Sequence, residues 1–184
     1  MREIFILRHL TTKNNINGLI SGRSEIGIIC KKLIGVEKIK LLHKVYSSPS
    51  ERCRKTIKTF FKQFGMAVET NYDNRLLERH MGEFEGRSKK ELLILYPDYF
   101  ILYNSQIRFN PLMTPPFGES YDDFSQRIKS FYTECCYKDN SETNILICSH
   151  NQTLKRLLLL INQKKSTELL KTEDIPNGKI CKVL

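Results

Sequence analysis

Short runs of apolar and β-branched residues recur along the chain and predict five buried strands. These runs are Ile4–Leu7, Lys44–Ser47, Ala67–Thr70, Asn144–Cys148 and Lys179–Leu184. Stretches with the apolar spacing of amphipathic helices separate them. Strands that alternate with helices favour a mostly parallel sheet, because the connecting helices then cover both of its faces. The sequence therefore predicts an α/β fold, a three-layer α/β/α sandwich with a mostly parallel central sheet.

Capping residues mark the expected starts of three helices. In "SPSE", Ser48 is the expected N-cap and Pro49 the first helical residue, and Gly65 is the expected stop of the same helix. Ser88 opens a second helix in "SKKE", and Ser120 opens a third in "SYDD". Each of these serines can accept a hydrogen bond from an otherwise unpaired N–H group of the first turn.

The region between the first two strands is the least regular part of the prediction. Residues 25–42 are expected to be helical, although Gly27 and Gly35 interrupt them. No repeat, low-complexity segment or linker divides the sequence. A chain of 184 residues suits one domain over residues 1–184, with a substantial core.

Composition limits the classes of partner. Thirty Lys and Arg against twenty Asp and Glu give a net charge of +10, which favours anionic partners. The basic residues are spread along the chain, and no aromatic-plus-basic motif of a nucleic-acid reader occurs, so nucleic acid is not expected. No apolar run reaches the roughly 20 residues that span a bilayer, so no membrane partner is expected either.

The cysteines indicate a reducing compartment. They form neither a CxxC pair nor a zinc-type spacing, which predicts reduced thiols, a cytoplasmic protein, and no metal or other cofactor. The six are Cys30, Cys53, Cys135, Cys136, Cys148 and Cys181. The sequence leaves the oligomeric state open, with a homodimer among the options.

Cations and imidazoles stand where the predicted strands end. The run "EIFILRHLTTKNN" ends its strand at Arg8 and His9, and "ILICSHN" ends another at His150. Between them, "KVYSSPSERCRKT" leads from a strand into a helix with Arg52 in its first turn. Each residue alone is compatible with a structural role. Parallel strands bring their carboxyl ends to one edge, however, where guanidiniums, imidazoles and a helix N-terminus would together bind a phosphate group.

These segments resemble the histidine phosphatase superfamily, in its phosphoglycerate mutase-like branch. The resemblance covers nearly the whole chain and includes small phosphatases of the alpha-ribazole phosphatase type. Its motifs, in the family's order, are "LRHLTTKNN", "YSSPSERCRKT", "LLERHMGEFEG", "PPFGES", "ICSHNQTLKRLL" and "IPNGKICKVL".

The resemblance implies metal-independent hydrolysis of a small phosphorylated metabolite through a phosphohistidine. It makes His9 the nucleophile and Glu78 the proton donor and acceptor, while Arg8, Arg52 and His150 would hold the phosphoryl oxygens. Further positions carried over as substrate contacts are Asn15, Ser21, Gly22, Arg79 and Asn151.

The chain also departs from the family pattern. Leu10 replaces the usual Gly after the nucleophile, Thr11 replaces an acidic residue, and the segment between Gly22 and Tyr46 is short. The motif "ERHMG" is closer to mutases, so mutase-type phosphoryl transfer is one alternative. A catalytically weak relative that serves as a binding or scaffold protein is another.

Overall fold

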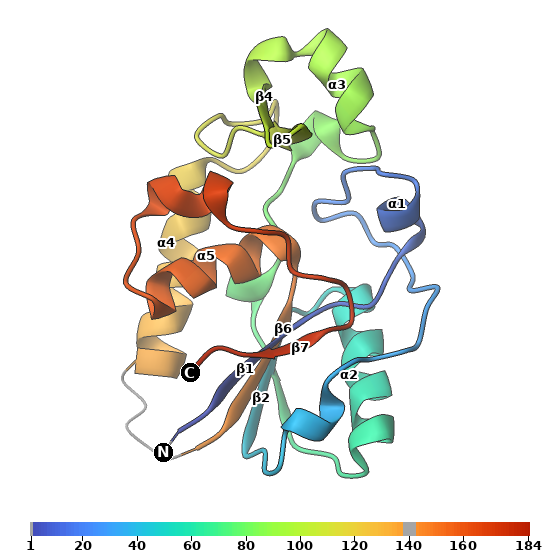
Figure 1. The fold of residues 1–184 in the computed structure, drawn as a ribbon, viewed down its shortest axis with the longest axis vertical. Coiled ribbons are helices and arrows are strands. Elements are labelled where there is room, and N and C mark those ends of the chain that lie inside the picture. The colour runs from blue at the N-terminus through green and yellow to red at the C-terminus, as the bar shows by residue number, and fades with distance from the viewer. Residues whose placement is uncertain (1, 138–142) are drawn as a thin grey trace.

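A five-stranded sheet forms the middle layer of the computed structural model, which describes residues 2–137 and 143–184 (Figure 1). The strand order is β3-β2-β6-β1-β7. The strands are β1 (Ile4–Arg8), β2 (Lys44–Ser47), β3 (Thr70–Tyr72), β6 (Ile145–Ser149) and β7 (Ile180–Lys182). The first four run parallel and β7 pairs antiparallel with β1, which confirms the mostly parallel sheet.

Helices cover both faces of this sheet. On one side lies α2 (Glu51–Phe64), and on the other lie α4 (Tyr121–Phe131) and α5 (Asn151–Ile161) (Figure 1). Successive side chains of a strand point to opposite faces, so Ile4 and Ile6 of β1 pack in the core with α4 and α5, while the alternate residues pack with α2. The predicted three-layer sandwich is confirmed.

A small lobe stands above the carboxyl edge of the sheet (Figure 1). It consists of α3 (Lys89–Leu95) and an antiparallel hairpin of β4 (Phe100–Tyr103) and β5 (Gln106–Phe109). The periodicity of the sequence did not predict this hairpin. Its turn residues Asn104 and Ser105 both have positive φ, 48° and 59°, in a pair that is not the usual Asn-Gly or Asp-Gly signal.

The prediction of a helix over residues 25–42 is wrong. A single 3₁₀ turn, Val36–Lys38, occurs there, and the rest is extended or irregular. Ile28 bridges to Thr12, and the segment pairs again near Gly35, whose φ is 88°. These long-range pairings use backbone N–H and C=O groups that a helix would need. The positive φ of Gly35 would also interrupt a helix. The α-helix between β1 and β2 is the short α1 (Lys13–Ile16), which lies before this segment.

The capping predictions hold for two helices and fail for one. Ser88 Oγ and Ser120 Oγ accept the expected bonds at the starts of α3 and α4, and Gly65 ends α2 with a φ of 80°. The start of α2 is shifted, since the helix begins at Glu51 after Ser50 rather than at Pro49.

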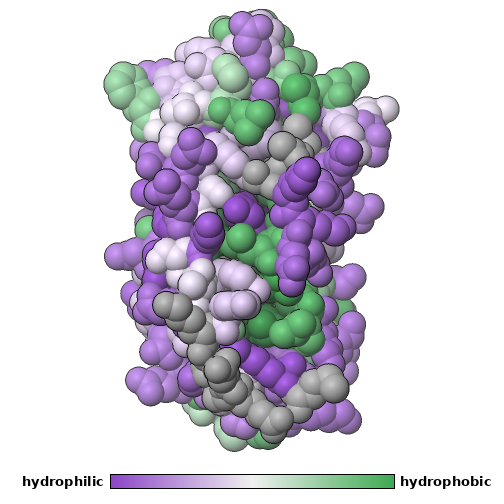
Figure 2. All heavy atoms as spheres, turned by 90° about the vertical axis from the view of Figure 1, so that its left-hand side faces the viewer, coloured by the Kyte–Doolittle hydropathy of each residue, from purple (hydrophilic) through white to green (hydrophobic). Residues whose placement is uncertain are grey.

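On the face shown in Figure 2 the surface is mainly polar, with apolar side chains at its upper end and in a patch at and below its middle. On the lobe, Ile94 and Leu102 are 81% and 74% exposed. Among the described residues, no helix is both long and apolar enough to cross a membrane.

Candidate active site

A cavity of about 330 Å³ lies where the carboxyl ends of the strands meet the lobe. Most of the side chains that the sequence analysis selected line it, and they come from segments far apart in the chain. The selected residues that line it are Arg8, His9, Asn15, Ser21, Gly22, Arg52, Glu78 and Asn151. The ring of His150 lies next to that of His9, with 5.3 Å between the ring centroids.

His9 is a buried, neutral imidazole of defined tautomer. Its Nδ1 lies 2.7 Å from the carbonyl oxygen of Leu10, which can only accept, so Nδ1 carries the hydrogen and Nε2 the lone pair. Burial first, and then the nearby charges of Arg52 and Arg8, together lower the pKa of His9 to about 3. The side chain thus offers an unprotonated Nε2 in neutral solution.

The second imidazole, His150, is held in the opposite tautomer. Its Nδ1 accepts a hydrogen bond from Arg52 Nε at 3.0 Å, and burial, then Arg52, keeps its pKa well below the usual range. The ring therefore carries its hydrogen on Nε2, which donates to Ser48 Oγ at 2.9 Å. Ser48 Oγ also accepts from Ser50 N at 3.4 Å, so the hydroxyl serves both the imidazole and the backbone just before α2.

Two guanidiniums lie beside the imidazoles. Arg52 is 1% exposed and donates through Nη1 and Nη2 to the carbonyls of Ser24 and Gly22, both at 2.6 Å. Arg8 donates through Nη1 to the carbonyl of Ile175 at 2.7 Å, and its buried Nε has no hydrogen-bond partner among the described residues. An unpaired, buried cationic N–H is costly unless an anion meets it.

The carboxylate of Glu78 lies at the N-terminus of α5. Its Oε2 accepts from Gln152 N at 3.2 Å, and its Oε1 accepts from the backbone N–H and the hydroxyl of Thr153 at 3.2 and 3.0 Å. A carboxylate at this place compensates the positive end of the helix dipole. The side chain is thereby fixed at the cavity wall.

Not every predicted contact faces the cavity. Arg79 is fully buried and donates to the carbonyls of Pro111, Met113 and Glu119, so its guanidinium holds the chain between the lobe and α4. We therefore leave it out of the proposed substrate contacts. The amide of Asn151 lines the cavity but bonds to Asp174 Oδ1 and Ile175 N.

Leu10, which replaces the family's glycine, points away from the cavity. Its side chain is 1% exposed and belongs to the core under α2. Its backbone N–H donates to Thr56 Oγ1 at 2.9 Å, and its carbonyl orients His9. The substitution leaves the cavity open because only backbone atoms of Leu10 serve the site.

Sequence reasoning missed the cations at the outer part of the cavity. Lys89 comes from the start of α3, Arg108 from β5 and Lys155 from the second turn of α5. The signal for Lys155 was present, since it follows His150 by five residues and lies on a helix that the motif had already placed. The hairpin that carries Arg108 was not predicted, and that residue could not be placed without it.

No group of three or more His, Cys, Asp or Glu side chains is arranged to hold a metal ion within residues 2–137 and 143–184. The polar atoms around His9 are instead mostly N–H donors, which suit an anion.

Two neutral imidazoles flanked by two guanidiniums, at the carboxyl edge of a parallel sheet, define a phosphatase of the histidine type. The profile of the "Histidine phosphatase superfamily (branch 1)" matches residues 4–184, and the chain belongs to this family.

Sequence and structure comparisons agree with this assignment. A protein of Hydrogenobacter thermophilus, provisionally named phosphoserine phosphatase 2, is 30% identical over 168 residues, which cover 88% of this chain and 79% of that protein. Among solved structures, Bacillus stearothermophilus YhfR superposes with a TM-score of 0.81 at 21% identity, covering 99% of this chain and 90% of the other. The alpha-ribazole phosphatase from Shigella flexneri gives 0.75 at 19% identity, covering 98% and 89%.

Proposed function

We propose that the protein hydrolyses a small phosphomonoester through a phosphohistidine formed on His9. The observation that carries this proposal is the lone pair of His9 Nε2, which stays unprotonated because Nδ1 donates to Leu10 and burial lowers the pKa of the ring. An imidazole in this state is a competent nucleophile at neutral pH.

The reaction has two balanced steps. First, His9 Nε2 bonds to phosphorus while the bond from phosphorus to the leaving oxygen breaks, and Glu78 gives its proton to that oxygen. Second, a water molecule attacks phosphorus, the bond to Nε2 breaks, and the proton of the water passes to Glu78. Arg8, Arg52 and His150 bind the phosphoryl oxygens and offset charge that develops on them in both steps.

Trapping the intermediate tests the mechanism. A substrate labelled in its phosphoryl group, quenched rapidly in base, should leave label on the wild-type protein, in a bond that acid then breaks. We expect no label and no turnover from His9→Ala. His43→Ala is the matched control, because His43 is exposed at the opposite end of β2. Turnover retained by His9→Ala would refute the mechanism.

The outer cations support a substrate with a second negative group. Lys155 is buried and lines the cavity together with Lys89, and burial lowers its pKa while Asp174 opposes that shift. Lys155 Nζ also pairs with Asp174 Oδ1 at 3.3 Å, and a carboxylate on the substrate would add a second negative group beside Lys155, Lys89 and Arg108. Phosphoserine, a substrate named for the relative of Hydrogenobacter, carries such a group.

A substrate panel separates the remaining alternatives. We expect phosphoserine to be hydrolysed with a higher kcat/KM than phosphoethanolamine, which lacks the carboxylate, and Lys155→Met to reduce this difference. Isomerisation of 3-phosphoglycerate without release of phosphate would instead indicate the mutase alternative.

All six cysteines are free thiols, which supports our placing the enzyme in the cytoplasm.

A further inference from the structure

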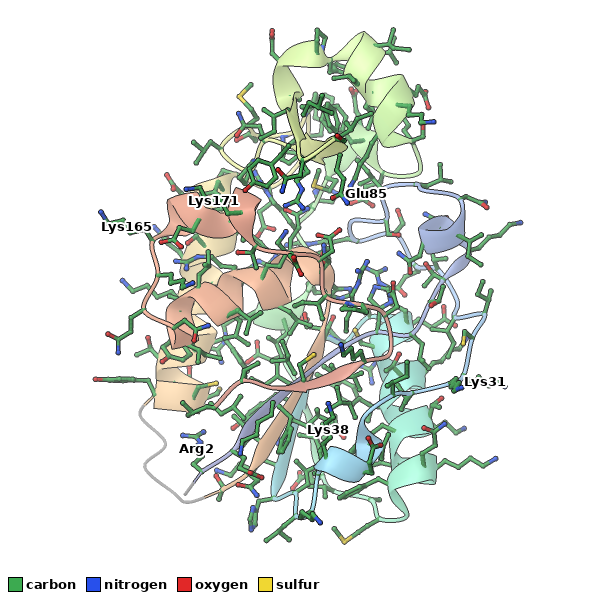
Figure 3. The ribbon with its side chains drawn as sticks, in the orientation of Figure 1. Arg2, Lys31, Lys38, Glu85, Lys165 and Lys171 are labelled. Carbon is green, nitrogen blue, oxygen red and sulfur yellow. The ribbon has the colours of Figure 1, made fainter. Side chains whose placement is uncertain are left out.

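Glu85 connects the lobe side of the cavity to the loop that follows α1 (Figure 3). Its Oε1 accepts hydrogen bonds from Arg23 N at 2.8 Å and Met81 N at 3.0 Å. Its Oε2 accepts from Ser24 Oγ at 2.6 Å, and the side chain is 14% exposed. One carboxylate thus connects residues 23 and 24 to the segment that follows Glu78, beside a second anchor in which Arg23 donates to the carbonyl of Glu78 and pairs with Glu119, both at 3.2 Å.

The opposite side of this loop holds Arg52. The carbonyl oxygens of Gly22 and Ser24 accept from the two terminal nitrogens of its guanidinium. The Nε of Arg52 then donates to Nδ1 of His150. The loop 22–24 therefore lies between Glu85 and Arg52, and its two carbonyls determine the plane of the guanidinium.

Gly22 shows how closely Glu85 approaches the loop. Its φ is 46°, in the region that favours glycine, and a Cβ built on it would overlap Oε1 of Glu85. The carboxylate therefore occupies the space that any other side chain at position 22 would need. The need for glycine at position 22 therefore has a structural cause, which does not depend on contact with a substrate.

We propose that Glu85 is a positioning residue, which sets the orientation of Arg52 and, through Arg52, of His150 by holding loop 22–24. The catalytic consequence rests on the proposed function. Glu85 does not line the cavity and touches no reacting atom, so it acts through the loop.

Removing the carboxylate should not detach the lobe. Ile20 and the segment after Glu85 exchange two backbone hydrogen bonds, Ile20 N to Arg87 O at 2.9 Å and Gly86 N to Ile20 O at 2.7 Å. These bonds do not involve the side chain of Glu85. Its loss should therefore alter loop 22–24 and the guanidinium rather than the fold of the lobe.

Kinetics of double variants test whether Glu85 acts through Arg52. We expect Glu85→Ala to lower kcat/KM for an aryl phosphate by about 10- to 100-fold in the wild-type background, but by less than about threefold in an Arg52→Lys background. Glu85→Gln should restore most of the rate, because its amide can accept from Arg23 and Met81 and donate to Ser24. Glu83→Ala removes an exposed carboxylate two residues away and should have no effect.

An equal loss from Glu85→Ala in both backgrounds would overturn the proposal, and so would no loss in either. Circular dichroism at the assay temperature checks that the variants are folded. If Glu85→Ala does not fold, Ser24→Ala makes the same comparison, since it removes the partner of Oε2 alone.

A spectroscopic readout separates this proposal from the proposed function. The ¹H–¹⁵N resonance of Arg52 Nε reports its hydrogen bond to His150 without turnover. It should shift or broaden in Glu85→Ala and return in Glu85→Gln, whereas an unchanged resonance would refute the positioning role. A wild-type protein that failed to hydrolyse any phosphomonoester would refute the proposed function and leave this measurement valid.

Discussion

The residue after the nucleophile contributes only its backbone to the site, and its side chain packs in the core. Leu10 uses its carbonyl to fix the tautomer of His9 and its N–H to bind Thr56, while its side chain fills the core under α2. A glycine could make the same two backbone contacts. The departure from the family pattern therefore affects stability and leaves the approach to His9 unaltered.

We expect Leu10→Ala to lower the free energy of unfolding by about 2 to 5 kcal/mol, which is the usual effect of replacing a buried leucine by alanine. We expect kcat/KM to change less than about threefold. Chemical denaturation and the aryl phosphate assay measure the two quantities. An increase in kcat/KM would show that the leucine obstructs the cavity after all.

Substitution of Glu78 distinguishes proton transfer from a purely structural carboxylate. Glu78→Gln keeps the shape of the side chain at the start of α5 but cannot give up a proton. We expect it to slow hydrolysis of an alkyl phosphate far more than that of a nitrophenyl phosphate, whose leaving group needs little protonation. Equal losses on the two substrates would assign Glu78 a positioning role alone.

The sequence could place Arg8 and Arg52 but not distinguish them from Arg79. The first two follow strand ends, where topology predicts a site, and the structure puts both at the cavity. Arg79 stands beside Glu78 in the chain, yet its guanidinium is buried against carbonyls of residues 111–119. Which way a long side chain turns depends on acceptors far away in sequence, which no local pattern reports.

Among the elements, α2 begins two residues later than its capping pattern predicts, next to the active site. Its sequence offers Ser48 as a cap, but the helix begins at Glu51 after Ser50, and the Ser48 hydroxyl bonds to both His150 and Ser50 N. Four of the five strands and the later helices followed their hydrophobic periodicity, whereas the strand expected at Ala67–Thr70 lies at Thr70–Tyr72. Residues 25–42 and the β4–β5 hairpin were not predicted, because long-range pairing and positive φ angles determine them.

The contact between α2 and the loop after β1 depends on one hydroxyl. Thr56 Oγ1 donates to the carbonyl of Arg52 and accepts from the N–H of Leu10, and it is fully buried. Thr56→Val leaves that N–H without an acceptor, so we expect a loss of about 1 to 3 kcal/mol in unfolding free energy. Thr56→Ser keeps the hydroxyl and should lose less. A larger loss in Thr56→Ser than in Thr56→Val, measured by urea titration, would mean that the methyl group contributes more than the hydrogen bond.

For the whole molecule, the buried imidazoles couple stability to pH. The pKa of His9 is about 3 in the folded protein and 6.5 for an unperturbed histidine, so the unfolded chain binds more protons between these values. The stability is therefore fully present above about pH 6.5 and is lost as the pH falls toward 3. His9 alone should cost about 2 kcal/mol at pH 5, and His150 acts in the same direction.

Urea unfolding at pH 7.5 and pH 5 measures this loss. The carboxyl groups whose pKa is lowered, such as Asp73 and Glu119, act at lower pH and do not dominate this interval. We expect His9→Gln to lose less stability between the two pH values than the wild type. The same loss in both proteins would show that other groups carry the pH dependence.

The lobe is formed by one continuous segment between β3 and α4, whereas the residues of the reaction centre come from several strand ends along the chain. Residues 89–109 carry Lys89 and Arg108 to the cavity and include no residue to which we assign a chemical step. A single continuous exchange of coding sequence could thus give the enzyme a new substrate range without rebuilding its chemistry.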